Sequence, residues 1–74
     1  MKVWFKDNNI YIYDAERGEA FMPLSLFPRL QSASENDRQN FELGPFGIHW
    51  PTLDEDLSYD GFYSYLKSQE LIES

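Results

Sequence analysis

The side chains best suited to chemistry in this sequence are its single histidine, His49, and the acidic run Asp54-Glu55-Asp56 that follows it. Imidazole and carboxylate groups bind metal ions and transfer protons when further ligands or a positioned nucleophile converge on them. His49 lies between Ile48 and Trp50, so in a strand whose neighbouring side chains face the core it faces solvent. We therefore favour a structural or surface role for His49 over metal binding or catalysis.

The acidic run has three interpretations. As a cation site it lacks the glycine-containing loop and the terminal bidentate glutamate of a calcium-binding motif. Its carboxylates can instead stabilise the start of a following helix, where they lie against the positive end of the helix dipole. They can also form part of a docking surface for a basic partner. The sequence favours the capping role and keeps the docking surface as the main alternative.

Patterns typical of enzymes are missing. The chain has no cysteine, which excludes disulfides, thiolate metal sites and thiol nucleophiles. It has no glycine-rich phosphate loop, and none of its serines lies in a nucleophile-elbow pattern. We expect a protein that is not an enzyme and needs no cofactor, with no catalytic or metal-binding residues.

Charge is distributed unevenly along the chain. The net charge is −7, and all of it lies in residues 34–74, where Arg38 and Lys67 are the only bases. A nucleic-acid-binding domain needs cations that replace the counterions of phosphate, so direct binding of nucleic acid is disfavoured. A basic protein would be attracted to this C-terminal half. The simpler alternative is that the acidic residues keep a small, aromatic-rich protein soluble.

A docking surface would combine acidic residues with an apolar stripe near the end of the chain. Its expected acidic members are Asp54, Glu55, Asp56 and Asp60. Tyr65 and Ile72 fall on one stripe of the last helix, beside its buried face, and an exposed stripe of this kind often marks a protein interface. A frayed C-terminal turn is the alternative for this end of the chain.

The first third of the chain has the pattern of a β-meander. β-Branched and aromatic residues are frequent in Lys2–Lys6, Ile10–Tyr13 and Glu19–Met22, and the Ile-Tyr-Ile-Tyr run suits a strand with both faces covered. The run Asp7-Asn8-Asn9 suits a tight hairpin turn, because Asn and Asp tolerate positive φ. Pro23 cannot donate to a sheet ladder, so the third strand ends there or lies at an edge.

Short helices and further strands are expected next. Ser25 can cap a helix over Leu26–Gln31 with Pro28 in its first turn, and Ser34 can cap a second helical turn. Two strand pieces, Phe41–Leu43 and Gly47–Trp50, flank a segment with two glycines and a proline, which predicts a turn.

The final helix is expected to begin after Ser58, a good N-cap. Tyr59, Phe62, Tyr63 and Leu66 follow the spacing of one buried face, so we expect this helix to pack on the sheet. Trp50 is the largest candidate core side chain, and a ligand platform is the alternative for it. Together the elements predict a single α+β domain over residues 1–74, with a small, mainly antiparallel sheet and short helices.

The N-terminus argues against export. Lys6 and Asp7 interrupt the first apolar run at once, whereas a signal peptide needs a longer one. No stretch approaches the roughly 20 apolar residues of a membrane span. We expect a cytoplasmic protein that does not bind membranes.

The most distinctive part of the sequence is the run FELGPFGIHWP (residues 41–51), followed by LDEDLS (residues 53–58). It resembles the bacterial family known as domain of unknown function 2442, in which a strand ends in a Trp-Pro pair and a short loop leads to an Asp-Leu-Ser-like element and a brief helix. Trp50, Pro51, Leu57 and Ser58 match that pattern as structural signature residues. The resemblance covers nearly the whole chain and implies a small α+β fold with no known activity.

The resemblance also bears on function. Members of that family occur alone or ahead of a helix-turn-helix domain, and the stand-alone members are often encoded beside another small protein. We therefore expect a protein-interaction module, with the role of an acidic, antitoxin-like partner in a two-gene pair as its sharpest form. A regulatory domain that senses a ligand or self-associates, related to those fused to helix-turn-helix regulators, is the alternative.

Overall fold

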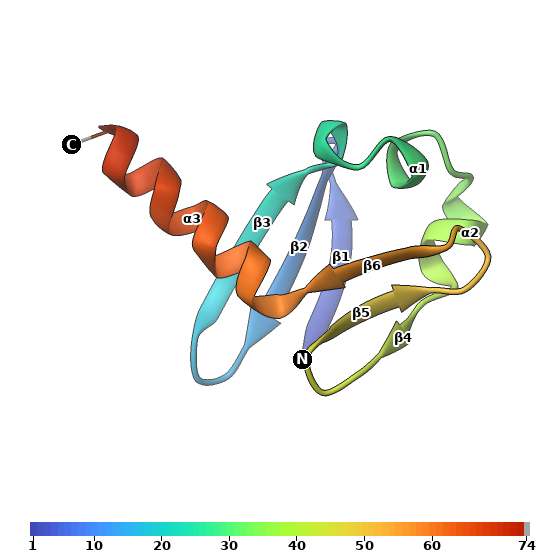
Figure 1. The fold of residues 1–74 in the computed structure, drawn as a ribbon, viewed down its shortest axis with the longest axis horizontal. Helices are drawn as coiled ribbons and strands as arrows, with labels where there is room; N and C mark the ends of the chain where they lie inside the picture. The colour runs from blue at the N-terminus through green and yellow to red at the C-terminus, as the bar shows by residue number, and fades with distance from the viewer. Residues whose placement is uncertain (74) are drawn as a thin grey trace.

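The computed structural model describes the backbone of residues 1–73 and the side chains of residues 1–69. The chain forms two three-stranded antiparallel sheets, short helical turns that join them, and one long C-terminal helix (Figure 1). The predicted α+β class is therefore confirmed. The later strands form a sheet of their own and do not extend the first one.

The first sheet is the predicted meander, with strand order β1-β2-β3. Its strands are β1 (Lys2–Lys6), β2 (Asn9–Asp14) and β3 (Gly18–Pro23). Asp7 and Asn8 have φ of 52° and 63°, the consecutive positive values that suit a two-residue hairpin turn. As predicted, β3 ends at Pro23 and lies at an edge of the sheet.

Only one face of the first sheet belongs to the core. Ile10 and Ile12 of β2 are fully buried there. The alternate residues Tyr11 and Tyr13 lie on the other face, where Tyr13 is 43% exposed. The prediction that both faces of this strand are covered is wrong, because the long helix makes its main sheet contacts with β3.

Three short helical elements connect the sheets. They are a 3₁₀ turn, η1 (Leu24–Leu26), and the helices α1 (Pro28–Gln31) and α2 (Glu35–Gln39). The predicted helix over Leu26–Gln31 is confirmed for Pro28–Gln31, but its earlier start and its cap at Ser25 are wrong, since Ser25 lies inside η1. A residue before proline avoids the helical conformation, and Phe27 accordingly has φ −130° and ψ 81°, which separates η1 from α1.

The helix α2 joins α1 to the second sheet. Its predicted cap is confirmed, because the Ser34 hydroxyl accepts a hydrogen bond from the Asp37 N–H at 3.1 Å. The guanidinium of Arg38 donates to the carbonyls of Leu30 at 2.9 Å and Gln31 at 2.6 Å. These hydrogen bonds supply partners for carbonyl groups at the C-terminal end of α1. The backbone of Arg38 in turn accepts a hydrogen bond from Trp50 in the second sheet.

The second sheet has strand order β4-β5-β6. Its strands are β4 (Glu42–Leu43), β5 (Gly47–Trp50) and β6 (Glu55–Ser58). The first two were predicted, but β6 was not, because its acidic residues were interpreted as a helix cap. Pairing across the sheet outweighs the low strand propensity of these residues, since Ile48 lies opposite Leu57 and both are buried.

The long helix, α3 (Tyr59–Glu73), follows β6 directly. Ser58 caps it as predicted, accepting the Gly61 N–H at 3.0 Å. Its predicted face is confirmed, because Tyr59 and Phe62 are buried and Leu66 packs against the core. No helix in the described part of the chain is both long enough and apolar enough to cross a membrane.

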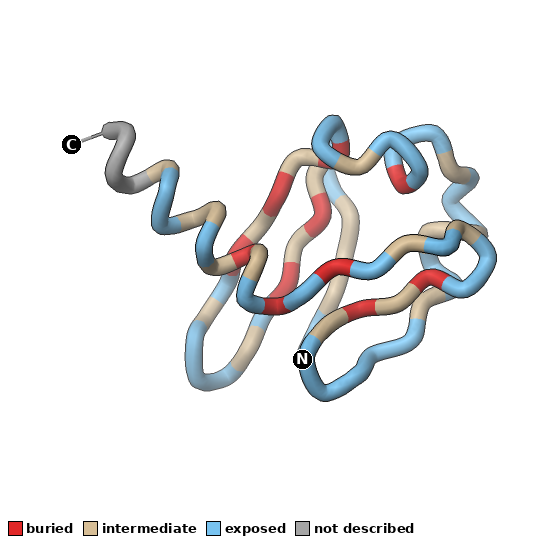
Figure 2. The backbone as a smooth tube through the Cα atoms, in the orientation of Figure 1, coloured by how far each residue is buried: buried red, intermediate tan, exposed pale blue. Residues whose placement is uncertain are grey.

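The core lies where the inner faces of the sheets meet α3 and the short helices. Figure 2 shows its buried positions alternating with less buried ones along β2, β3 and β5, as expected for strands with one covered face. The buried apolar residues are Ile10, Ile12, Ala20, Met22, Leu24, Leu30, Ile48, Trp50, Leu57, Tyr59 and Phe62.

Candidate docking site at the β4–β5 turn

The turn between β4 and β5 presents an aromatic side chain to solvent. Phe46 is 84% exposed, more than any other large apolar side chain in the described part of the chain. Leu43, in the strand that leads into the turn, is 47% exposed. Leaving these side chains in water forfeits the free energy that their burial would give, about 1.5–3 kcal/mol for each one. Both side chains are therefore accessible to contact by another molecule.

The turn that carries Phe46 is held firmly by hydrogen bonds. Gly44 N–H donates to the Gly47 carbonyl at 2.8 Å, and Tyr59 N–H donates to the Phe46 carbonyl at 3.0 Å. The Tyr59 hydroxyl donates to the Gly44 carbonyl at 2.8 Å. Because Tyr59 is itself buried, α3 fixes the turn from two sides. These hydrogen bonds hold the backbone at Phe46 in a defined position.

Gly47 is required by the close approach of β5 to β6. A Cβ at this position would collide with the carbonyl oxygen of Leu57 and lie 3.0 Å from the Cα of Ser58. Only glycine allows the two strands to come this close. Because Gly47 has no side chain, backbone atoms form the bottom of the surface beside Phe46. This leaves a hollow there.

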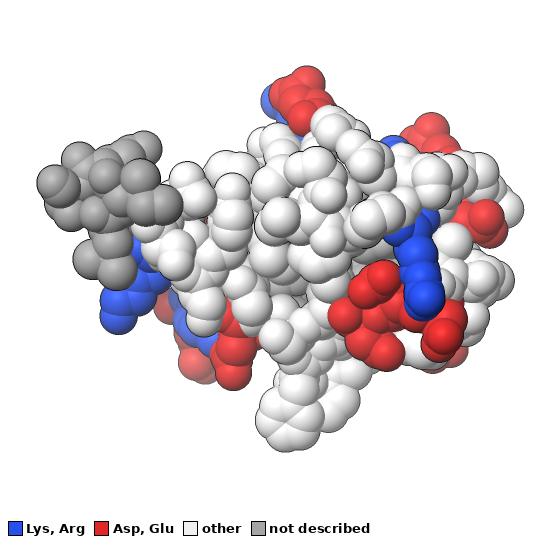
Figure 3. All heavy atoms as spheres, turned by 45° about the horizontal axis from the view of Figure 1, so that its top comes forward, with Lys and Arg blue, Asp and Glu red and all other residues white. Residues whose placement is uncertain are grey.

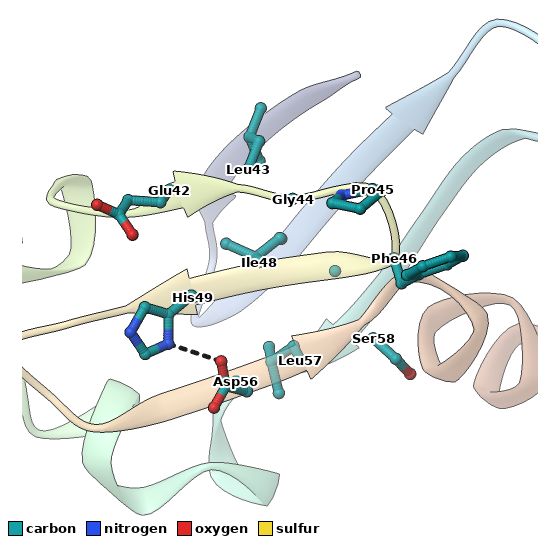
Figure 4. Close-up of a pocket in the computed structure, with 11 residues that line it drawn as sticks. Glu42, Leu43, Gly44, Pro45, Phe46, Ile48, His49, Asp56, Leu57 and Ser58 are labelled. Carbon is teal, nitrogen blue, oxygen red and sulfur yellow. Dashed lines mark hydrogen bonds and ion pairs between the residues drawn. The ribbon is translucent and has the colours of Figure 1, made fainter.

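The hollow has a volume of about 480 Å³ and lies along the second sheet from Glu42 to Ser58 (Figure 4). Its apolar members include Leu43 and Phe46, and its polar border includes Glu42, His49 and Asp56. The last three lie in one row across β4, β5 and β6. The hollow therefore combines an apolar surface with a border that carries two carboxylates.

His49 is placed as the sequence predicts, pointing away from the core while Ile48 and Trp50 point into it. Its Nδ1 lies 2.6 Å from a carboxylate oxygen of Asp56, and both side chains are substantially exposed. Within residues 1–69 no group of three His, Asp or Glu side chains is arranged to hold a metal ion. His49 and Asp56 can therefore bind and orient a polar group at the border of the hollow.

The acidic residues predicted to bind a partner lie in different places. Asp54 precedes β6 and accepts a hydrogen bond from Arg29 at 2.7 Å through its carbonyl. Asp56 pairs with His49, and Asp60 at the start of α3 accepts from Arg17 at 2.8 Å. Each carboxylate stays open to solvent despite these contacts, with exposed fractions of 94% for Asp54, 74% for Asp56 and 86% for Asp60.

The acidic groups near the second sheet gather on one side of the molecule. Glu55 lies beside Asp54 and Asp56 in sequence and is partly exposed at the start of β6. Figure 3 shows a group of acidic side chains around a basic side chain, next to a protruding part of the surface that carries no Lys, Arg, Asp or Glu. Arg29 and Asp54 form an ion pair with 3.8 Å between the charged atoms.

The predicted apolar stripe of α3 is only partly described. Tyr65 is partly buried and packs its ring edge-on against Phe21 of β3, with 6.3 Å between the ring centroids. Ile72 lies outside the residues whose side chains are described. The structure therefore places Tyr65 at the border of the first sheet, away from the turn that carries Phe46.

The signature residues have structural positions. Trp50 is completely buried, and its indole N–H donates to the Arg38 carbonyl at 2.9 Å. Leu57 is buried opposite Ile48, and Ser58 caps α3. Pro51 is exposed where the chain leaves β5. With no free face or polar group on its ring, Trp50 serves as a core residue and not as a ligand platform.

A family model for proteins described as "Protein of unknown function (DUF2442)" matches residues 1–68. The chain belongs to this family. No curated protein and no solved structure matches it. The DUF2442 signature read from the sequence, Trp-Pro followed by Asp-Leu-Ser, thus forms the end of β5, the inner face of β6 and the cap of α3.

The sequence interpretation did not select Phe46 or Glu42 as site residues. Phe46 was considered only as part of a turn. A signal for it was present, because the middle of a Gly-Pro-Phe-Gly turn is an exposed position. Glu42 joins the site only through the cross-strand register, in which it lies opposite His49, and a single strand sequence does not reveal that register.

Proposed function

We propose that this domain is a non-enzymatic protein-interaction module that docks a basic protein at the hollow beside Phe46. The observation that carries the proposal is the 84% exposure of Phe46 on a turn fixed by buried Tyr59. Interfaces draw most of their binding free energy from a few well-placed anchors, with aromatic residues prominent among them. A rigidly presented phenylalanine beside an apolar hollow has the properties of such an anchor.

The chemistry of the partner follows from the border of the hollow. Glu42 and Asp56 contribute carboxylates there, and the region from residue 34 onward carries the whole net charge of −7. Charge complementarity speeds encounter and suppresses acidic competitors. The partner is therefore a basic protein that offers an apolar side chain to the hollow and lysine or arginine to its border.

Within this proposal the domain acts as the acidic, antitoxin-like member of a two-gene pair. A small basic protein would be covered at the hollow and held inactive until it is released. The support for this sharper form is the excess of acidic residues and the exposed apolar anchor. Both members of such a pair would act in the cytoplasm.

A ligand-sensing domain is the second candidate function. The hollow of about 480 Å³ has the size of a small-molecule site. However, it is open along a sheet surface, and Trp50, the residue expected to form a ligand platform, is buried with its N–H already bonded. Protein docking explains the protruding Phe46, whereas a small ligand in the hollow would leave most of that ring in water.

The test measures binding of the purified chain to the protein encoded beside it by titration calorimetry. We expect a complex at micromolar concentration, which Phe46→Ser weakens by about 30-fold, the effect of losing a strong anchor. Leu26→Ser is the matched control, because Leu26 is also an exposed apolar residue at 52% but lies in η1. A complex unaffected by Phe46→Ser, or no complex with that protein, contradicts the proposal.

A further inference from the structure

We infer that the outer face of the first sheet is a second, separate interface, at which two copies of this chain pair. This face is opposite the core and carries an aromatic row across all three strands. Trp4 stacks on Tyr11 with 5.4 Å between ring centroids, and Tyr11 contacts Phe21 at 5.5 Å. Tyr65 of α3 extends the row at its β3 end.

The row does not belong to the core. Val3 and Phe5, which alternate with Trp4 along β1, pack against the core cluster. Trp4, Tyr11 and Phe21 stay partly exposed on the other side of the sheet. An antiparallel sheet with one solvated face normally places polar side chains on that face. A continuous aromatic row in that position is the composition of an interface core.

Charge at this face permits the approach of a second copy. The ladder register places Lys2, Tyr13 and Glu19 in one row across the sheet, and Lys6 lies farther along β1. The outer face thus has two lysines against one glutamate, whereas the acidic excess of the chain begins at residue 34. Two acidic molecules that meet through this face therefore bring no excess of carboxylates together.

The arrangement of the charges also selects one geometry. A two-fold axis that lies between the copies, parallel to β2, sets β1 of one copy over β3 of the other. Lys2 then faces Glu19 of the second copy, Trp4 faces Phe21, and Tyr11 faces its own counterpart. An axis perpendicular to the strands would instead set Lys2 of one copy over Lys6 of the other, so that like charges would face each other. The isologous pair with the axis along β2 is therefore the complementary one.

The size of the face sets the strength of pairing. Three strands about 4.8 Å apart, each rising about 3.4 Å per residue, give a face of roughly 14 by 17 Å. Such a face covers roughly 240 Å² on each copy, so pairing buries on the order of 500 Å² in total, below the roughly 1,200 Å² at which standard specific interfaces begin. We therefore expect a weak, reversible dimer, with a dissociation constant of roughly 100 micromolar or higher.

The first test is sedimentation equilibrium of the full chain over a concentration series. The expected result is a shift from the monomer mass of 8.8 kDa to twice that value. Tyr11→Glu sets two carboxylates against each other on the axis and abolishes the dimer, while Phe46→Ser leaves it intact. A monomer at all concentrations, or a dimer that survives Tyr11→Glu, overturns the inference. A dimer lost in Phe46→Ser overturns it too, because self-association then uses the hollow.

The second test is a charge exchange that does not touch the aromatic row. Lys2→Glu and Glu19→Lys each place like charges opposite one another in both symmetric pairs and weaken the dimer by about tenfold. The double variant restores the pairs and the affinity. Lys67→Glu, the same change of charge on exposed Lys67 of α3, is the control and leaves the affinity within about twofold. Failure of the double variant to recover overturns the two-fold geometry.

A competing use of the same face is stacking of single-stranded nucleic acid, which also combines aromatic rings with lysines. Its probe is an oligothymidine titration followed by tryptophan fluorescence, in which Trp4 reports on the face. We expect no change at physiological salt, because the net charge of −7 opposes phosphate. Saturable binding by the monomer overturns the inference of a dimer interface.

Discussion

Replacing Tyr59 by phenylalanine tests whether α3 holds the turn that carries Phe46. Tyr59 is only 7% exposed, so phenylalanine fills the same space and only the hydroxyl is lost. That hydroxyl donates to the Gly44 carbonyl at 2.8 Å, and a hydrogen bond of this kind contributes about 0.5–1.5 kcal/mol net. Gly44 is exposed, so water reaches its carbonyl in the variant, and we expect a loss of about 1 kcal/mol.

Alkaline pH provides a second readout of the same contact. Burial raises the pKa of Tyr59 above its ordinary value of 10.0. As pH rises, the unfolded chain releases this proton first and binds fewer protons than the folded chain, so stability falls. The contribution is fully present below pH 10.0 and is lost as the pH rises through the higher folded-state pKa. Tyr59→Phe removes this part of the alkaline loss.

The assay is urea unfolding followed by tryptophan fluorescence, at neutral and at alkaline pH. Tyr63→Phe is the matched control, because Tyr63 also donates to a carbonyl, that of Gly18 at 2.8 Å, and burial also raises its pKa. Both variants lose stability, but only Tyr59→Phe loosens the turn and weakens partner binding. A Tyr59→Phe protein with unchanged stability at neutral pH and an unchanged alkaline slope would refute the reasoning.

The remaining predictions concern packing, docking and acid stability. Gly47→Ala forces β5 and β6 apart and lowers the free energy of unfolding by about 1–3 kcal/mol, measured by urea denaturation; an unchanged midpoint contradicts the close approach. Phe46→Ser leaves that free energy within about 0.5 kcal/mol while it reduces binding, since the ring is outside the core. The backbone N–H of Glu16, and then Arg17, hold the pKa of Asp14 below 3.8. Its stabilising contribution is therefore lost only as the pH falls through that lowered value, and Asp14→Asn flattens the acid limb of the pH–stability curve.

Local sequence signals predicted much of the fold. The positive φ values of Asp7 and Asn8, the caps at Ser34 and Ser58, and the buried face of α3 all depend on interactions within a few residues. Such short-range chemistry is visible in the sequence because the partners are neighbours. The burial of Trp50 was also predicted from its size.

The failures concern contacts between distant parts of the chain. The strand β6 was missed because Glu55 and Asp56 are poor strand formers. They adopt strand conformation because they pair with Trp50 and His49 of β5. The separation of η1 from α1 was missed because the effect of Pro28 on Phe27 was not weighed against the capping potential of Ser25. The turn between β4 and β5 was predicted from its glycines and proline. Its hydrogen bonds to Tyr59 were not predicted, because they join parts of the chain that are distant in sequence.

The two outer sheet faces handle solvent in different ways. The second sheet exposes a row of Glu42, His49 and Asp56 next to the backbone of Gly47. Water can hydrogen-bond to these polar groups, but it cannot hydrogen-bond to the ring of Phe46. The first sheet exposes a row of aromatic rings, whose contact with water is unfavourable. A chain of this length buries only about 60% of its unfolded surface and has little stability to spare. Keeping large rings outside such a core is costly unless they are covered by another molecule. The proposed second copy would cover the rings of the first sheet, and the hollow would remain accessible to the proposed basic partner.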